Sequence, residues 1–389
     1  MSSAALADAL ERVESIGPLI VDRAESAEAR GCLDEDVVDA MHDRGLYRTL
    51  VPQELGGLGL TLPESVEVVR AVSTFDASVG WTFGIMSGGP LFGRLLAEDE
   101  FTRIFSEPRV AVAGSLNPLT GRADPVDGGF RFTGTAQYAS GCKHATWLVA
   151  GAWVHRNGQP SFVDERPELV AGMVPTTDVR INDTWSVSGM RATGSNDCTI
   201  DRVVVPEGRV FSWFDAVPRF DTGTFGRIPL IMQFGPPLAA SVVGAARGAQ
   251  QRFVELAAAK RPTGVGTVLA ERAYAQMAVG EAEGLILAAE DTLAAAVRDV
   301  WSHGESMQRF DLESRVRMRS RVVSSVRLAA RAVDLLHDAA GMNGVAIPSA
   351  LERAWRDVHT ASQHVLLSVA RLEITGRALL GLDPGAPVI

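Results

Sequence analysis

Two histidines close to the C-terminal end are the first residues whose type and spacing suggest chemistry. His359 and His364 lie in the apolar, helix-like stretch RDVHTASQHVLLS, which spans Arg356 to Ser368. A neutral imidazole can donate, accept or move a proton near neutral pH. On a regular helix, a spacing of five residues places the two rings roughly 140° apart, whereas a zinc-binding pair is spaced by four. Only one ring can then face a given pocket, and we predict no metal site.

Two turn sequences in the middle of the chain carry hydroxyl groups that could orient a bound molecule. The first, SGCKHATW, begins at Ser140, and the second, GMRATGSNDC, contains Thr193, Gly194 and Ser195. Each turn by itself is explained by its content of Gly, Ser and Asn, which are common turn residues. His364 by itself would similarly be explained as a core histidine bonded to a neighbouring hydroxyl. The combination of these segments is more informative than any one of them.

The elements that must position these residues follow a helical, β, helical order. Residues 1–108 show apolar residues at helical spacing, which predicts an N-terminal helical domain. Residues 109–215 contain short, Val-rich, often alternating runs separated by turn residues, which predicts a middle β-domain built as a sandwich or barrel. Residues 216–389 return to long amphipathic patterns with Arg-rich outer faces, as in an antiparallel helical bundle.

The composition is that of a folded globular protein without a nucleic-acid surface. Of the 389 residues, 46% are hydrophobic and 22% are charged, and the net charge of -10 argues against a basic stripe. No apolar stretch is long enough to span a bilayer, so we expect no membrane partner. Three scattered cysteines and the lack of a signal peptide indicate reduced thiols in a cytoplasmic protein. No dinucleotide fingerprint, phosphate loop or nucleophile elbow is present.

Four segments in this order give the chain a family resemblance. They are GLYRTLVPQELGGLGL, SGCKHATWLVAGA, GMRATGSNDCTIDRVVVPE and GMNGVAIPSALERAWRDVHTASQH. The chain resembles, over nearly all of its length, flavoproteins with the acyl-CoA dehydrogenase fold. Within that fold it is most similar to two-component flavin-dependent monooxygenases, such as the oxygenase components that hydroxylate 4-hydroxyphenylacetate or steroid-ring phenols, and dibenzothiophene monooxygenase. The resemblance implies a mainly α, α+β fold with a C-terminal four-helix bundle, and a homotetramer.

The stretch around His364 separates the two branches of this family. Acyl-CoA dehydrogenases have Arg-Asp, a short spacer and then Tyr-Glu-Gly, and in many of them that Glu removes the α-proton of the substrate. In this chain His364 stands in the place of the Tyr and Val365 in the place of the Glu. Valine cannot accept a proton. The resemblance therefore favours the monooxygenases, in which a His of this segment lies beside the reactive edge of the flavin.

The resemblance also implies a reaction. A separate reductase would supply reduced FMN or reduced FAD, and oxygen would add to give a C4a-hydroperoxyflavin that hydroxylates an aromatic or polycyclic small molecule. His364 would donate to the distal peroxide oxygen or shuttle a proton, and Ser140 would bond near flavin N5 or the substrate oxygen. Three alternatives stay open: N-oxygenation of an amino sugar or S-oxygenation on the same fold, an acyl-CoA dehydrogenase, and a non-enzymatic scaffold.

Further binding residues follow from the same resemblance. Arg261 lies in KRPTGVG, where related dehydrogenases have Arg-x-Gln-Phe-Gly in contact with FAD across a subunit boundary; the Gln-Phe pair is missing, which leaves FMN and FAD both open. A glycine turn, GMNG, matches one that approaches the cofactor from a neighbouring subunit. The expected cofactor-binding residues are Ser140, Trp147, Thr193, Gly194, Ser195, Arg261, Gly341 and Gly344. The expected substrate-binding residues are Asn117, Trp213, Phe214 and His359.

Overall fold

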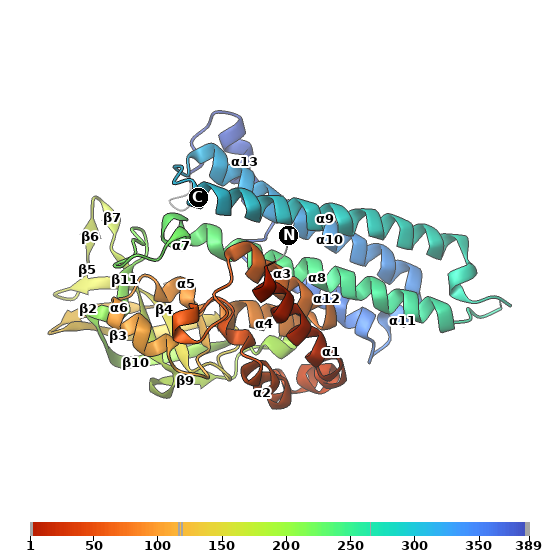
Figure 1. The fold of residues 1–389 in the computed structure, drawn as a ribbon, viewed down its shortest axis with the longest axis horizontal. Helices are drawn as coiled ribbons and strands as arrows, with labels where there is room; N and C mark the ends of the chain where they lie inside the picture. Colours follow the sequence, from red (N-terminus) through yellow and green to blue (C-terminus); the bar gives the residue numbers. More distant parts are fainter. Residues whose placement is uncertain (1–2, 116, 118–119, 265, 386–389) are drawn as a thin grey trace.

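The computed structural model describes residues 3–115, 117, 120–264 and 266–385. Figure 1 shows a group of N-terminal helices, a sheet region at one end of the molecule, and a bundle of long helices that extends away from the sheet. The elements follow one another in the chain as helices, then strands, then helices.

The N-terminal part consists of helices whose ends are set by local capping. They are α1 (Ala4–Arg30), α2 (Glu35–Asp43), α3 (Leu62–Phe75), α4 (Ala77–Ser87), α5 (Gly89–Gly93) and α6 (Glu98–Phe105). Thr61 and Glu64 form a reciprocal capping box at the start of α3. Helix α4 is buried almost all round, because it packs against α3, the bundle and the first strand. Side chains on α4 can therefore reach the middle of the molecule.

The strands form one continuous sheet rather than two separate sheets. Its nine strands are β1 (Val112–Ser115), β2 (Arg122–Val126), β3 (Gly129–Ala139), β4 (Trp147–Arg156), β5 (Gln159–Pro160), β8 (Leu169–Pro175), β9 (Val179–Asn182), β10 (Asn196–Pro206) and β11 (Val210–Ser212). The main path is β11-β8-β4-β2-β3-β10-β9, and β1 and β5 also pair with β4. A small hairpin is made by β6 (Phe162–Val163) and β7 (Arg166–Pro167).

Strand β4 shows why this sheet has apolar residues on both faces. Trp147 and Val149 belong to a core shared with the N-terminal helices. Leu148 and Ala150, which point the other way, belong to a core shared with β3 and β10. Both faces are covered, so the strand is a continuous apolar run rather than an alternating one.

The C-terminal part is built on three long helices. Its helices are α7 (Thr224–Arg227), α8 (Leu230–Ala259), α9 (Ala273–Glu305), α10 (Leu312–Ala340), α11 (Met342–Val345), α12 (Ala350–Ala361) and α13 (Arg371–Leu379). Helix α9 buries Ala282, Ile286, Ala289 and Leu293 at helical spacing. Helix α10 packs along both α8 and α9, as Figure 1 shows. No helix in the described part of the chain is both long and apolar enough to cross a membrane.

The expected regular helix through both histidines is wrong. Helix α12 ends at Ala361, and His364 lies in a series of turns that follows it. The Ser362 hydroxyl donates to the carbonyl oxygen of His359 at 2.8 Å, the acceptor that the next helical N–H would use. The N–H of Gln363 instead bonds to Thr360, three residues back. The N–H of His364 likewise bonds to Ala361, so the chain leaves the α-helix in turns closed over three residues.

Candidate functional site

Trp81 contacts both His364 and Ser140, although the three residues come from three different parts of the chain. The rings of Trp81 and His364 lie edge to face, with their centroids 5.3 Å apart. The indole Nε1–H of Trp81 donates to Ser140 Oγ over 3.2 Å. Trp81 comes from α4, Ser140 from the turn after β3, and His364 from the turns after α12. The structure therefore brings together both residues predicted to be catalytic.

The hydroxyl groups of the two predicted turns form a chain behind Ser140. Ser140 Oγ lies 2.7 Å from Ser195 Oγ, which lies 2.6 Å from Thr193 Oγ1. Thr193 Oγ1 in turn donates to the carbonyl oxygen of Met190 over 2.8 Å. All three hydroxyl residues are buried. The turns SGCKHATW and GMRATGSNDC are thus two sides of one polar site in an otherwise apolar interior.

The imidazole of His364 is neutral and has one free nitrogen. Burial, and to a smaller degree the charge of Arg371, lower the pKa of His364 to about 4. The backbone N–H of Leu366 donates to Nδ1 over 3.3 Å, so the proton of the neutral ring is on Nε2. Nε2 makes no hydrogen bond to any residue in the described ranges. It can therefore donate to a bound molecule.

Two glycines allow the polar turns to approach their neighbours closely. Gly141, with φ +75°, lies so near α4 that a Cβ would stand 2.8 Å from the sulfur of Met86. At Gly194, with φ +52°, a Cβ would stand 2.9 Å from the carbonyl oxygen of Gly31. A larger residue at either position would be strained by the backbone and crowded by its neighbour. Gly194 therefore has a structural role, which is to let the turn pack against Gly31, and its predicted role in cofactor binding stays a prediction.

The segment that carries Met190 is held by a buried acidic residue on α12. Asp357 is 2% exposed and its Oδ1 accepts the N–H of Met190 at 2.5 Å. Burial, followed by the charge of Asp76, raises the pKa of Asp357 to about 7. Arg353, also on α12, binds Asp76, the residue that precedes α4, over 3.3 Å.

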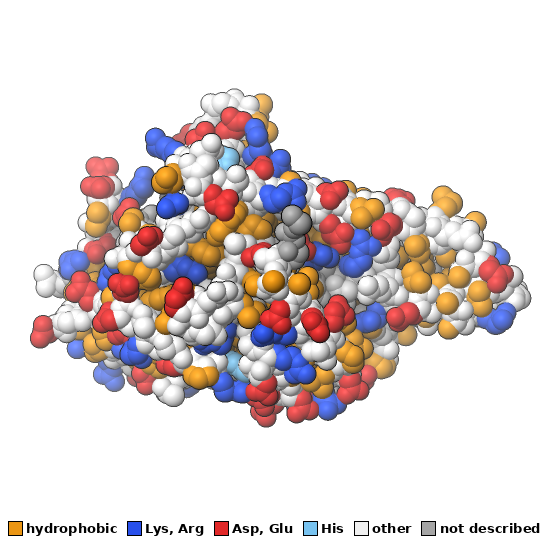
Figure 2. All heavy atoms as spheres, viewed as in Figure 1, with side chains coloured by type: hydrophobic (Ala, Val, Ile, Leu, Met, Phe, Trp, Pro, Cys, Tyr) orange, Lys and Arg blue, Asp and Glu red, His pale blue; other side chains and the backbone are white. Residues whose placement is uncertain are grey.

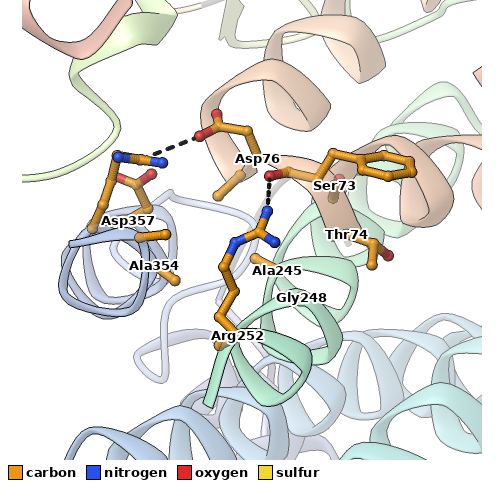
Figure 3. Close-up of a pocket in the computed structure, with 13 residues that line it drawn as sticks. Ser73, Thr74, Asp76, Ala245, Gly248, Arg252, Ala354 and Asp357 are labelled. Atoms are coloured by element: carbon orange, nitrogen blue, oxygen red, sulfur yellow. Dashed lines mark hydrogen bonds and ion pairs between the residues drawn. The ribbon is translucent and has the colours of Figure 1, made fainter. Parts of the chain in front are cut away.

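Figure 3 shows the hollow in which these acidic residues lie, between α3, α4, α8 and α12. Arg252 reaches across from α8 to donate to the carbonyl oxygen of Phe75 at 2.9 Å. Asp76 caps the start of α4 by accepting the N–H of Val79. The contacts around this hollow therefore connect α4, which carries Trp81, to α12, which precedes His364.

The sequence did not single out several residues that shape the site. Trp185 donates its Nε1–H to the same carbonyl oxygen of Met190, at 2.9 Å. Asn196, fully buried, accepts two backbone N–H groups at Thr184 and Trp185. Tyr138 has a positive φ of 61° and is 63% exposed beside the ring of Trp185. A strained, exposed aromatic residue at a strand end suggests a functional surface, but the sequence contained no signal of the strain.

Trp147 lies apart from this polar site. It is buried in the core between the sheet and the N-terminal helices, where the guanidinium groups of Arg103 and Arg209 lie over its ring. Its burial is explained by packing. Successive side chains of β4 point to opposite faces of the sheet, so Trp147 faces the N-terminal helices and Leu148 faces the other way.

The predicted substrate-binding residues lie in three separate segments of the structure. Asn117 is half-buried in the loop after β1, where its N–H bonds to Ser115. Trp213 packs at the edge of the core between sheet and helices, and Phe214 follows it in the same loop. His359 faces α10, because its Nε2 lies 2.8 Å from Asp334 Oδ1. The two histidines thus face different ways, as expected.

The other predicted cofactor residues lie far from this site in the same chain. Arg261 is exposed in the loop after α8, Gly341 directly precedes α11, and Gly344 lies within α11. Lys260 donates to the carbonyl oxygen of Ala340 at 2.5 Å, which ties the two segments together. Figure 1 shows both at the end of the bundle opposite the sheet. One copy of the chain therefore does not bring them to Ser140.

Two small hollows lie beside the N-terminal turns of α8. One, of about 20 Å³, is lined by Met232, Met318, Leu366 and their neighbours, which include Arg315 and Arg319. The other, of about 10 Å³, includes Ile85, Phe234 and Leu238. Leu366 is two residues from His364, and its N–H fixes the tautomer of that ring. The first hollow therefore lies beside the segment that carries His364.

The chain belongs to the acyl-CoA dehydrogenase family. The models of its N-terminal domain and of its C-terminal domain match residues 17–94 and 237–369. A pigment production hydroxylase of a Rhodococcus species is 30% identical, over 98% of each chain. The oxygenase component of an FADH2-dependent resorcinol hydroxylase of a Rhizobium species is 29% identical, over 96% of this chain and 94% of the relative.

A solved structure leads to the same family. XiaF from a Streptomyces species, in complex with FADH2 and glycerol, superposes with a TM-score of 0.90, 27% identity, and coverage of 99% of this chain and 98% of the other. The predicted fold, the predicted family and the predicted class of enzyme, a flavin-dependent monooxygenase that uses reduced flavin, are confirmed.

Proposed function

We propose that this enzyme is the oxygenase component of a two-component system and hydroxylates an aromatic or polycyclic small molecule at the Trp81–Ser140–His364 site. The neutral, singly protonated His364 beside a buried polar turn is the observation that carries this proposal. The position that a dehydrogenase would use for its base is Val365, which is 55% exposed and cannot take a proton. Resorcinol, a phenol, is named as the substrate of one relative.

The residues of the site suit a reduced flavin. The ring system would lie along the turn of Ser140 and the segment of Thr193–Ser195, where buried hydroxyls offer hydrogen bonds and the exposed Tyr138 offers a flat face. When bound, reduced flavin would supply the two electrons that allow one atom of O2 to enter the substrate and the other to leave as water. We propose that His364 donates a hydrogen bond from Nε2 to the oxygen being transferred, and that the apolar surroundings exclude water.

The substrate would occupy the hollow lined by Met232, Met318 and Leu366. Its lining combines apolar side chains, which would pack against an aromatic ring, with Arg315 and Arg319. The cavity of about 20 Å³ holds little more than one water molecule, so its walls must move apart to admit a substrate. Oxidation at sulfur or nitrogen would use the same site, and the experiment below distinguishes these outcomes. Asn117, Trp213 and Phe214 remain candidates for an outer substrate contact.

A homotetramer and a transient reductase belong to this proposal. Exposed apolar side chains gather on the outer part of the bundle, at Tyr274, Met277, Leu287, Met342, Val345 and Ile347, and Figure 2 shows apolar side chains at that end. A second copy would cover them and would carry Arg261 and Gly341 to the cofactor of its neighbour. Substitution of Met277 and Met342 by Glu should lower the native mass and weaken flavin binding. We place the enzyme in the cytoplasm, because its cysteines are free thiols.

The test begins with the protein under anaerobic conditions. Reduced FMN and reduced FAD are added separately, oxygen is admitted, and the absorbance spectrum is followed with and without a panel of phenols, a thioether and an amino sugar. We expect a delay before oxidised flavin appears with one of the two flavins, and a hydroxylated product with a phenol. Immediate reoxidation with both flavins, at the rate of free flavin, would refute the proposal. Product from the thioether or the amino sugar alone would reassign the substrate.

A further inference from the structure

The chain of hydrogen bonds through Ser140 ends in one group that can only donate and in another that can only accept. At one end is the indole N–H of Trp81, which can only donate. At the other end is the carbonyl oxygen of Met190, which can only accept. Three hydroxyl groups lie between them, and each carries one hydrogen atom. The positions of all the hydrogen atoms in the chain therefore follow from geometry alone.

The direction is fixed from the carbonyl end. Thr193 lies 2.8 Å from the carbonyl oxygen of Met190 and must donate to it, because two lone pairs would otherwise face each other. Thr193 then has no hydrogen left for Ser195, 2.6 Å away, so Ser195 donates to Thr193. By the same reasoning Ser140, 2.7 Å from Ser195, donates to it.

Ser140 is left as an acceptor. Its single hydrogen is committed to Ser195, and one of its two lone pairs is committed to Trp81. The remaining lone pair is the only hydrogen-bonding capacity that Ser140 Oγ can offer to a ligand. The three hydroxyl residues are buried, with exposed fractions of 7% for Ser140, 4% for Ser195 and 2% for Thr193. Bulk water therefore cannot replace one of these hydroxyl groups as a hydrogen-bond partner. A ligand atom at Ser140 must therefore bring its own hydrogen.

This requirement discriminates between the two redox states of a flavin. Reduction adds a hydrogen at N5, which changes that atom from an acceptor into a donor. We propose that the chain from Trp81 to Met190 makes the site select reduced over oxidised flavin, with Ser140 Oγ accepting a hydrogen bond from N5–H. Oxidised flavin would place the N5 lone pair against the lone pair of Ser140. The inference rests on the proposed function and adds Trp81, Thr193 and Ser195 as residues that set the selection.

Thr193→Val is the sharpest test, because it removes the link next to the carbonyl group without changing the size of the side chain. Ser195 can then turn its hydrogen towards Ser140, and Ser140 can donate into the site. The ratio of the dissociation constants for oxidised and reduced flavin should fall about tenfold, which corresponds to a decrease of about 30 mV in the midpoint potential of the bound flavin. Ser195→Ala breaks the next link and should act in the same direction.

Both constants are measured at equilibrium, by titrating the protein with oxidised flavin in air and with reduced flavin under anaerobic conditions. Thr193→Ser keeps the hydroxyl group and should retain the wild-type ratio. Ser325→Ala is a matched control, because it removes a buried hydroxyl that bonds only within α10, to Val322 at 2.8 Å.

The outcomes separate the inference from the proposed function. A lower ratio in Thr193→Val and Ser195→Ala, with the wild-type ratio in the two controls, supports the inference. An unchanged ratio in both chain-breaking variants overturns it and leaves the proposed function standing. If Thr193→Val does not fold, Ser195→Ala alone decides. A wild-type protein that binds neither flavin state overturns both.

Discussion

Removal of the imidazole of His364 should shorten the time for which the enzyme holds activated oxygen. His364→Ala deletes one neutral hydrogen-bond donor, Nε2–H, from a half-buried position beside Trp81. One such bond is worth about 1 kcal/mol, and water that enters the vacated space adds to the loss. We expect the delay between oxygen addition and the appearance of oxidised flavin to shorten about tenfold. Hydrogen peroxide per flavin should rise to the same extent that product falls.

The pH dependence of the wild-type enzyme follows from the same ring. With a pKa lowered to about 4, the neutral form exceeds the charged form roughly a thousandfold at pH 7. The yield of product per reduced flavin should therefore be flat from about pH 6 to 8 and should fall only as the pH drops towards 4. A protonated His364 acting as the acid would instead give a yield that falls as the pH rises through about 6.5.

The assay is stopped-flow mixing of the protein and reduced flavin with oxygen, followed by measurement of peroxide and product. His359→Ala is the matched control, because that ring is bonded to Asp334 and faces away from Trp81. It should change the delay by less than twofold. If His364→Ala leaves both the delay and the peroxide yield at wild-type values, the role given to His364 is refuted.

Three further variants test the framework of the site. The pKa of Asp357 is raised to about 7, so the wild type loses folding stability as the pH rises through that value. Asp357→Asn lacks this carboxyl group and should therefore become more stable relative to wild type as the pH rises from 5 to 8. Parallel melting-temperature profiles of the two proteins would contradict this. Gly194→Ala should lower the free energy of unfolding by about 2 kcal/mol more than Gly128→Ala, since both glycines have positive φ but only Gly194 has a close neighbour. Equal decreases in chemical unfolding would show that the close approach does not matter. Trp213→Ala should weaken substrate affinity, measured as KM, about threefold if its loop forms an outer contact, and an unchanged KM would exclude it from the site.

The order of the elements could be read from the sequence because it depends on local patterns. Helical and alternating spacings separate the α-helices from the strands of the middle region. The end of α12 was missed, because the change to three-residue turns at Gln363 and His364 leaves no mark in a hydrophobic pattern. The contact of Trp81 with Ser140 could not be predicted, because it depends on how α4 packs against the turn of Ser140.

The sequence by itself determined the family, the type of chemistry and the absence of a base at Val365, because these depend on which side chains stand in short segments. The tertiary structure decided which of them act together. It placed His364 against Trp81 and set His359 towards Asp334. It also joined two turns, more than 50 residues apart in the chain, through the contact of Ser140 with Ser195. The direction of the hydrogen bonds there is a property of distances between atoms, which no linear pattern contains.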